Sequence, residues 1–210
     1  MIKTILFDLD GTLIDTPPVI IETFKELFET YIKDVKLTDE MYESFLGQSL
    51  YVTFMQYVDQ ARVSELVDIY RDVSEKKLEH TLRAYPYAQS TLKAIKKKKI
   101  PIGIVTSKLK TVALSHLKKV GLDDFIDYII GYEDVEHHKP DPEPLLKALT
   151  YFNAKPDEAI YIGDHENDIK AAKKAGMMSC AVTYSLRLDK MLLEQPDFVI
   201  DELRHIKDMI

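Results

Sequence analysis

Ile5-Leu6-Phe7-Asp8-Leu9-Asp10-Gly11-Thr12-Leu13-Ile14-Asp15 is the stretch of sequence that decides the fold. Its apolar start predicts a buried strand over residues 2–7, and Gly11 marks a turn after that strand. Side chains two positions apart lie on the same side of a strand, so Asp8 and Asp10 are expected to project together from its carboxyl end. In open parallel α/β sheets, ligands bind outside this end of the strands.

Two carboxylates this close together need a positive partner. They repel by roughly 4 kcal/mol at about 4 Å and an effective dielectric constant of about 20. Mg²⁺ is the simplest candidate, because it is a hard cation that prefers oxygen ligands. An ordinary strand end followed by an acidic turn is the alternative for this motif taken alone, and the rest of the chain decides between the two.

The composition is that of an ordinary globular protein with enough apolar residues for a core. Of 210 residues, 46% are hydrophobic and 30% are charged, and the formal net charge is −7. This charge argues against nonspecific binding of nucleic acid, which needs a basic surface. Cys180 is the only cysteine, which excludes an internal disulfide and favours a reducing, cytoplasmic setting. The apolar run before Asp8 is too short for a signal peptide or a membrane span.

Hydrophobic periodicity divides the chain into two kinds of segment. Residues 16–82 show only helical patterns, whereas strands and helices alternate after about residue 83. Such alternation is typical of an α/β fold with a doubly wound parallel sheet. The expected strands are 100–105, 128–130, 159–162, 179–183 and 198–200, and the expected helices are 92–98, 112–120, 143–152 and 169–175. We expect a core domain of residues 1–15 and 83–210, with a helical cap domain of residues 16–82 inserted after the first strand.

Three further polar motifs follow predicted strands. Thr106-Ser107 follows the strand at 100–105, and Gly163-Asp164-His165-Glu166-Asn167-Asp168 follows the strand at 159–162. Lys139 lies in the loop segment His137-His138-Lys139-Pro140-Asp141-Pro142. Because parallel strands end at one edge of a sheet, these residues are expected to converge with Asp8 and Asp10.

Taken in order along the chain, the four motifs resemble those of the haloacid dehalogenase superfamily of phosphohydrolases. Asp-x-Asp-Gly-Thr, a Thr after a strand, Lys-Pro-x-Pro and Gly-Asp-x-x-x-Asp occur here in the order that the family shows. The helical block resembles the type 1 cap of that family, and the resemblance extends from Asp8 to the last predicted strand. It implies a Rossmann-like catalytic core, Mg²⁺ as the cofactor and a small phosphorylated substrate.

The resemblance implies a role for each matching residue. Asp8 would be the nucleophile that forms an aspartyl-phosphate, and Asp10 would protonate the leaving oxygen and then deprotonate the attacking water. Lys139 would neutralise charge on Asp8 and on the phosphate. Thr106 and the main-chain N–H of Ser107 would hold phosphoryl oxygens. The implied metal ligands are Asp8, the main-chain carbonyl of Asp10, Asp164 and Asp168, the last as a ligand or as support for one.

The segment Phe45-Leu46-Gly47-Gln48-Ser49-Leu50 resembles the substrate-facing loop of the cap. Gly47 would allow a close approach, and Gln48 and Ser49 are expected to reach the substrate, although a plain turn between helices would have the same composition. Neither residue is an arginine, whereas the family's sugar-phosphate mutases tend to use a cap arginine to hold a second phosphate. A mutase resembling β-phosphoglucomutase is therefore disfavoured and remains the alternative activity.

Several polar residues near these motifs also have ordinary structural explanations. Asp168 could cap the helix that is expected to begin near Ile169. His165 departs from the family pattern and is expected to face solvent, with a substrate contact as the alternative. His137 and His138 are expected to be exposed loop residues, because a Mg²⁺ site does not require histidine.

Over the whole chain, the resemblance is strongest to the branch of phosphoglycolate phosphatases and PpaX-type pyrophosphatases. The expected substrate is a small acidic phosphorylated metabolite, such as phosphoglycolate, or inorganic pyrophosphate. A binding or regulatory protein of the same fold is the non-enzymatic alternative, but Asp8, Asp10 and Lys139, which such proteins usually lose, are all present. We expect a cytoplasmic monomer or homodimer with no nucleic-acid partner and no membrane association.

Overall fold

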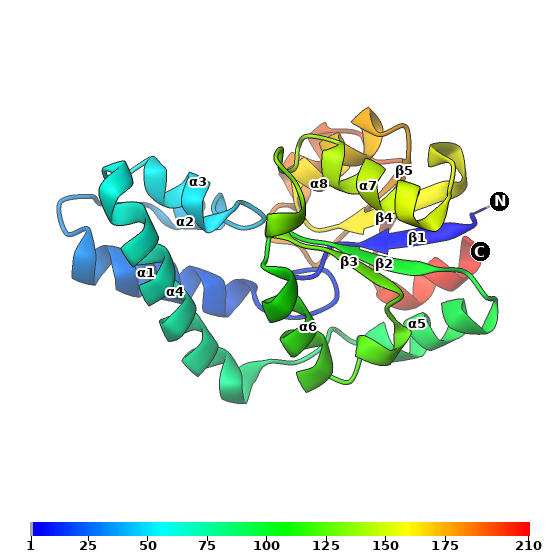
Figure 1. Ribbon diagram of the computed structural model, residues 1–210, viewed down its shortest axis with the longest axis horizontal. Helices are drawn as coiled ribbons and strands as arrows, with labels where there is room; N and C mark the ends of the chain where they lie inside the picture. Colours follow the sequence, from blue (N-terminus) through cyan, green and yellow to red (C-terminus); the bar gives the residue numbers. More distant parts are fainter. Residues whose placement is uncertain (1) are drawn as a thin grey trace.

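Residues 2–210 are described by the computed structural model, and they form one parallel sheet flanked by helices, with a helical block at one end (Figure 1). The six strands have the order β3-β2-β1-β4-β5-β6, and every neighbouring pair is parallel. This confirms the predicted α/β fold. The strands are β1 (Thr4–Phe7), β2 (Ile102–Val105), β3 (Tyr128–Ile130), β4 (Ala159–Gly163), β5 (Met178–Val182) and β6 (Phe198–Ile200).

β1 lies at the centre of the sheet, where the order of the strands changes direction. Phe7 pairs with Ile104 of β2 on one side and with Ile162 of β4 on the other. The carboxyl ends of these three strands therefore meet next to Asp8. This is the switch point at which doubly wound sheets bind their ligands.

Helices cover both faces of the sheet, and three of them begin earlier than the sequence predicts. α8 starts at Glu166 rather than at 169, because the His165 ring and the Asp168 carboxylate bind main-chain N–H groups of its first turn. The core helices are α5 (Ala88–Lys97), α6 (Lys110–Lys119), α7 (Glu143–Phe152), α8 (Glu166–Lys174) and α9 (Leu188–Leu193). Short 3₁₀ helices lie at Asp123–Phe125, Tyr132–Asp134, Pro156–Glu158 and Leu203–Asp208.

Alternate residues of each strand face opposite helical layers. Ile5 and Phe7 pack in the hydrophobic cluster that includes α5 and α6, whereas Leu6 packs in the cluster that includes α7 and α8. Figure 1 shows these two pairs of helices on opposite sides of the sheet. Because β1 is buried on both faces, it is a nearly continuous apolar run, as is usual in parallel sheets.

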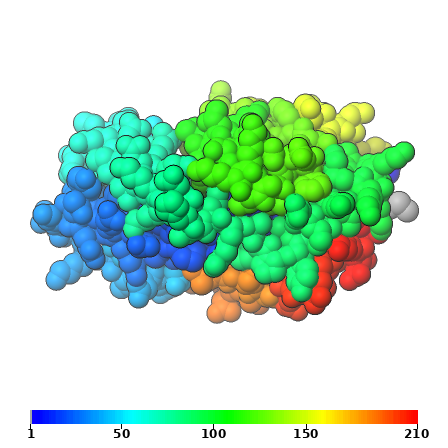
Figure 2. Space-filling model, turned by 90° about the horizontal axis from the view of Figure 1, so that it is seen from below, coloured from blue at the N-terminus to red at the C-terminus, as the bar shows by residue number. Residues whose placement is uncertain are grey.

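All the regular elements between β1 and α5 are helices, which confirms the α-helical cap inserted after the first strand. Figure 1 and Figure 2 show this block, coloured from blue to teal, at one end of the molecule beside the sheet. Its helices are α1 (Pro17–Tyr31), α2 (Asp39–Glu43), α3 (Leu50–Met55) and α4 (Gln60–Thr81).

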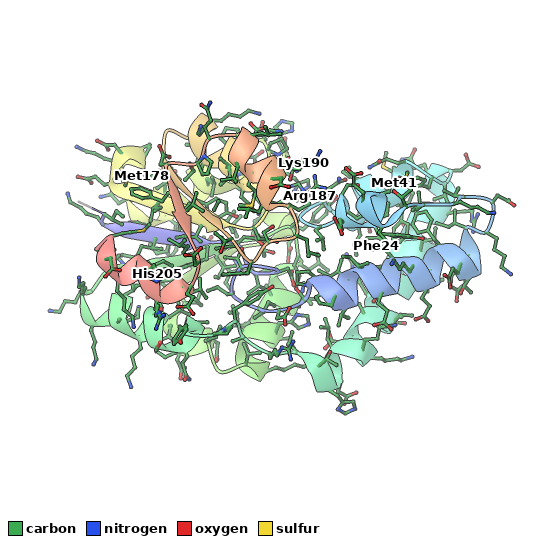
Figure 3. All side chains as sticks on the ribbon, turned by 180° about the vertical axis from the view of Figure 1, so that it is seen from behind. Phe24, Met41, Met178, Arg187, Lys190 and His205 are labelled. Atoms are coloured by element: carbon green, nitrogen blue, oxygen red, sulfur yellow. The ribbon has the colours of Figure 1, made fainter. Side chains whose placement is uncertain are left out.

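The helical block has a hydrophobic core of its own. Phe24, labelled in Figure 3, packs edge-on against Phe45 with ring centroids 5.0 Å apart and also contacts Phe54 and Tyr70. These residues form a cluster distinct from the two clusters that flank the sheet. A separate core is the feature expected of a domain, although its boundaries at residues 16 and 82 stay a prediction.

The two chain segments that join the block to the sheet lie side by side. Arg83 donates from Nε and Nη2 to Asp15 Oδ2 at 2.9 and 2.7 Å, and the Asp15 N–H donates to the Arg83 carbonyl at 2.9 Å. Ile14 and Ala84 form an isolated antiparallel bridge next to this pair. Within residues 2–210, no helix combines the length and apolar character that a membrane span requires.

Candidate active site

A buried lysine–aspartate cluster lies at the carboxyl ends of β1 and β4. The Lys139 ammonium donates to Asp8 Oδ1 at 2.8 Å and to Asp168 Oδ1 at 2.7 Å. Lys139, Asp8 and Asp168 are only 8%, 5% and 2% exposed. A lysine that is buried between two carboxylates is held in one position, because moving away from either carboxylate would leave a buried charge without a partner.

Tyr161 of β4 ties this cluster to the sheet. Its hydroxyl donates to the main-chain carbonyl of Val105 at 2.7 Å and accepts from Lys139 at 2.8 Å. The sequence pattern does not distinguish Tyr161, because a tyrosine in a buried strand is usually a core residue. Only the spatial neighbourhood of Lys139 distinguishes it.

Asp164 completes the acidic cluster. One oxygen each from Asp8, Asp164 and Asp168 lies within 4.8 Å of the others, and all three residues are buried. The Thr12 hydroxyl donates to Asp164 Oδ1 at 3.2 Å. Gly11 is required beside it, because a Cβ at Gly11 would lie 2.1 Å from Asp164 Oδ2. The Gly-Thr part of the first motif therefore positions a carboxylate from β4.

The cluster is short of positive charge. Burial raises the pKa of Asp8 from 3.8 to about 7, with Asp168 and Asp10 adding to the effect against the opposing influence of Lys139. Burial, followed by repulsion from Asp8 and Asp168, raises the pKa of Asp164 well above its usual value. Burial alone would lower the pKa of Lys139, but Asp168 and Asp8 outweigh it and hold that pKa well above the ordinary value.

The residues present fit a hard divalent cation. Buried carboxylates with uncompensated charge are the donor set that Mg²⁺ prefers. Both oxygens of Asp168 are already engaged, one by Lys139 and the other by the His165 N–H at 2.9 Å, so Asp8 and Asp164 offer the more open ligand atoms. The Asp10 side chain lies outside this acidic group, and coordination through its main-chain carbonyl stays a prediction.

Asp10 has a different electrostatic environment from Asp8. Its Oδ1 accepts from the Lys108 ammonium at 2.7 Å and from the Thr16 hydroxyl at 2.7 Å. Burial alone would raise the pKa of Asp10, but the Lys108 charge and these two hydrogen bonds lower it below the ordinary value. Two neighbouring carboxylates whose pKa values are driven apart are typical of an acid–base site.

A cavity of about 100 Å³ lies between the acidic cluster and the helical block. On the block side, the Ser107 hydroxyl donates to the Gly47 carbonyl at 3.0 Å, so the cap loop is docked on the loop after β2. The structure thus has the helical block closed over the strand ends. Among the residues that line the cavity are the predicted Asp8, Asp10, Gly47, Gln48, Thr106 and Ser107.

Ser49 is not among the residues that line this cavity, and its contact with a substrate stays a prediction. Its hydroxyl accepts from the Val52 N–H at 3.3 Å and caps α3. Gln48 does line the cavity, and its side-chain amide donates to the Ser44 carbonyl at 2.6 Å. The cap loop therefore combines one residue that faces the site with one that starts a helix.

His165 is buried, so the expectation that it faces solvent is wrong. It is 3% exposed, its Nδ1 accepts from the Asn167 N–H, and it packs on the cap loop where a Cβ at Gly47 would lie 2.9 Å from its ring. Its Nε2 is 3.4 Å from Glu166 Oε2 without hydrogen-bond geometry. Burial lowers the pKa of His165 to about 4, so the ring is neutral near pH 7.

The expectation that both loop histidines are exposed is confirmed for His137 and wrong for His138. His137 is exposed. His138 is half-buried and stacks on Tyr132 with ring centroids 4.2 Å apart. Neither belongs to the group of carboxylates that could hold a metal ion among residues 2–210.

Comparison with known proteins agrees with this geometry. The family model for haloacid dehalogenase-like hydrolases matches residues 5–182. Pyrophosphatase PpaX of Bacillus cereus (strain Q1) is 38% identical over 204 residues, which are 96% of this chain and 93% of the relative. Both matches span the acidic cluster and the helical block.

Solved structures show the same architecture. A protein from Bacteroides fragilis, described as a haloacid dehalogenase-like hydrolase, has a TM-score of 0.89 at 32% identity and covers 98% of this chain and 100% of its own. One from Haemophilus somnus 129pt, described as a predicted phosphoglycolate phosphatase, has a TM-score of 0.82 at 22% identity, over 99% and 97% of the two chains. At that lower identity the likeness concerns the fold alone. From its motifs, its fold and these relatives, the chain belongs to the haloacid dehalogenase-like hydrolases and is similar to their PpaX pyrophosphatases over nearly its whole length.

Proposed function

We propose that this phosphohydrolase cleaves inorganic pyrophosphate with the help of Mg²⁺, through an aspartyl-phosphate on Asp8. The observation that carries the proposal is the buried cluster in which Lys139 binds Asp8 beside Asp164. Asp8 as the nucleophile, the positive charge of Lys139 and carboxylate oxygens for a divalent cation would then act at one point. Phosphoryl transfer depends on this combination of positioning and charge neutralisation.

In the first step, a carboxylate oxygen of Asp8 attacks phosphorus. The bond between Asp8 and phosphorus forms while the bond between phosphorus and the leaving oxygen breaks. Lys139 binds Oδ1 of Asp8, which leaves the second oxygen for the attack. Thr106 and Ser107 line the cavity next to Asp8, where the Thr106 hydroxyl and the Ser107 N–H would hold phosphoryl oxygens.

Asp10 would move the protons. Asp10 is ionised in the free protein because its pKa is lowered, so it would first take up a proton as the substrate binds. It would donate this proton to the leaving oxygen in the first step and take a proton from the attacking water in the second, when the bond between Asp8 and phosphorus breaks. Lys108 and Thr16 both bind Oδ1, so the second oxygen of Asp10 is left for proton transfer. Asp10 lines the same cavity as Asp8, as this role requires.

Mg²⁺ would be held by Asp8, Asp164 and the main-chain carbonyl of Asp10. When bound, it would neutralise negative charge on the phosphoryl group. Asp168 would act mainly through Lys139, because its two oxygens bind Lys139 and the His165 N–H. The Asp168 carboxylate also caps the start of α8 by accepting from the His165 N–H. The capping role and the role in the site are therefore compatible.

The choice of pyrophosphate rests on the relative and on the cap. A PpaX pyrophosphatase is 38% identical over nearly the whole chain. The cap loop presents Gln48 to a cavity of about 100 Å³, which suits a compact substrate, and it offers no arginine for the second phosphate of a sugar bisphosphate. A phosphate ester such as phosphoglycolate is the second candidate, and a mutase is disfavoured.

Residues 16–82 would act as a cap that opens and closes over residues 1–15 and 83–210. The two joining segments are tied together by Asp15 and Arg83, so the block can rotate about this point without separating them. Closure would exclude water from the cavity around Asp8. The Ser107–Gly47 hydrogen bond belongs to the closed arrangement.

The experiment is a comparison of kcat/KM for pyrophosphate, phosphoglycolate and other phosphate esters, each with and without Mg²⁺. Pyrophosphate is expected to rank first, with turnover that needs Mg²⁺ and is lost in Asp8→Asn. Phosphoglycolate ranking above pyrophosphate would make the chain an ester phosphatase instead. Isomerised sugar phosphate with no net release of phosphate would establish the mutase alternative.

A further inference from the structure

Lys108 is a second lysine at the site, and the mechanism above gives it no contact with substrate. Its ammonium lies 2.7 Å from Asp10 Oδ1, and its side chain is only 17% exposed. Lys139 binds the nucleophile Asp8, whereas Lys108 binds the residue that would protonate the leaving oxygen. In the proposed mechanism the two lysines would therefore act on opposite sides of the phosphorus, one at the attacking oxygen and one at the leaving oxygen.

Two residues hold the Lys108 ammonium in place. Its Nζ lies 3.1 Å from Nδ1 of His116, a residue that is only 1% exposed, and His116 Nε2 lies 2.9 Å from Glu75 Oε2 on α4. Because an ammonium can only donate, Nδ1 must accept, and the proton of the neutral ring lies on Nε2 and is donated to Glu75. Lys119 also binds Glu75. A contact from the cap therefore orients a lysine of the core.

Lys108 lines two neighbouring cavities. The cavity of about 100 Å³ around Asp8 adjoins a larger one of about 360 Å³, and both are lined by Ser107 and Lys108. The larger cavity lies between α4 and α6, whose residues, teal and green, meet on the face shown in Figure 2. A phosphoryl group that is bound at Asp8 would direct its leaving group past Lys108.

We propose that Lys108 is a specificity-determining residue that binds negative charge on the leaving group. The site would then favour a phosphoanhydride, whose leaving group is itself a phosphate, over an ester with an uncharged alcohol. This inference rests on the proposed phosphohydrolase function and deepens it. In the complex, the leaving phosphate takes over hydrogen bonds that the Lys108 ammonium otherwise gives to Asp10, while His116 keeps the ammonium at the junction.

The kinetic test compares two substrates in three variants. Lys108→Met removes the charge, Lys108→Arg keeps it, and Lys110→Met is the matched control, because the Lys110 ammonium lies near Asp134 and the Tyr128 ring outside both cavities. The readout is the ratio of kcat/KM for pyrophosphate to that for p-nitrophenyl phosphate. Because p-nitrophenolate and phosphate both leave with little help from a proton, loss of support for Asp10 should lower the two rates by similar factors and leave this ratio nearly unchanged. Loss of a contact with the leaving phosphate should lower the ratio.

Lys108→Met is expected to lower the ratio by about 10–150-fold, the effect of one lost hydrogen bond between charged groups. Lys108→Arg should restore most of the ratio, and Lys110→Met should keep it at the wild-type value. A ratio that Lys108→Met leaves unchanged overturns the inference. So does a wild-type enzyme that hydrolyses p-nitrophenyl phosphate and rejects pyrophosphate.

Binding measurements separate this inference from the proposed function. Imidodiphosphate keeps the second phosphoryl group and resists hydrolysis, so its affinity can be measured by calorimetry with Mg²⁺ even for an inactive protein. Lys108→Met should weaken the binding of imidodiphosphate far more than the binding of orthophosphate. An equal loss of affinity for both would contradict a contact between Lys108 and the leaving group. If the wild type hydrolysed neither substrate, the proposed function would fail, and the calorimetry would still decide the role of Lys108.

Discussion

Replacing Asp8 by Asn is expected to stabilise the metal-free protein while abolishing turnover. In the folded state Asp8 shares Lys139 with Asp168 and lies beside a third buried carboxylate, Asp164, and burial raises the pKa of Asp8 from 3.8 to about 7. An unfolded chain releases this proton near pH 4, whereas the folded chain holds it until about pH 7. Ionising Asp8 therefore works against folding, and an Asn, which resembles the protonated acid in shape and charge, avoids that cost.

The size of the effect follows from the shift. A difference of about three pKa units corresponds to roughly 4 kcal/mol, which the wild type loses progressively as the pH rises from about 4 to about 7 and does not regain above it. The free energies of unfolding of wild type and Asp8→Asn should thus be similar near pH 4. Near pH 8 the variant should be the more stable by a few kcal/mol.

Urea denaturation with excess chelator, followed by circular dichroism, measures this difference at several pH values. Asp34→Asn is the control, because it makes the same chemical change at an exposed position and should alter stability by less than about 0.5 kcal/mol. Adding Mg²⁺ should then stabilise the wild type more than Asp8→Asn, since binding to the folded state adds to stability. A variant that is less stable than wild type at pH 8, or a difference that does not grow with pH, would refute the reasoning.

Three further predictions concern the metal, the acid–base residue and the cap. Turnover should need Mg²⁺ and be inhibited by Ca²⁺, which takes more ligands in a looser geometry, and full activity after exhaustive chelation would exclude a metal role for the aspartates. Asp10→Asn should slow single-turnover phosphorylation of Asp8 more with an alkyl phosphate than with pyrophosphate, because a poor leaving group needs the proton; equal losses would exclude Asp10 as the general acid. Gly47→Ala should raise KM without preventing folding, because its Cβ would lie 2.9 Å from the His165 ring in the closed form. Adding His165→Gly removes the ring and also the His165 Cβ, which would lie 3.0 Å from the new methyl group, so it should lower KM part of the way, while the strain of Ala at φ +73° remains. A KM that does not fall at all would argue against the His165 contact.

The parts of the molecule that the sequence predicts are those coded by local pattern. Asp8, Asp10, Thr106 and Asp164 each follow a buried apolar run, so the edge of a parallel sheet brings them together once the fold is recognised. The same holds for α7, whose bounds of 143 and 152 agree with the periodicity of its apolar residues. By contrast, the sequence does not predict α9, because its six residues are too few to show a helical period.

What the sequence does not predict depends on contacts between distant segments. Tyr161 is an apolar-strand residue by pattern and joins the site only because Lys139 arrives from another loop. Lys108, His116 and Glu75 have no distinctive sequence pattern, and only the contact between α4 and α6 brings them together. The sequence also predicts an exposed His165, because it does not show that the cap loop at Gly47 packs on this side chain.

Covalent trapping of the phosphorylated enzyme tests the central claim most directly. The protein would be mixed with pyrophosphate and Mg²⁺, quenched in acid after less than one turnover and reduced with borohydride, which converts an aspartyl-phosphate to homoserine. Peptide mass spectrometry should find homoserine at position 8 only when substrate and Mg²⁺ are both present. An unmodified Asp8 in an enzyme that releases phosphate under the same conditions would contradict the aspartyl-phosphate mechanism.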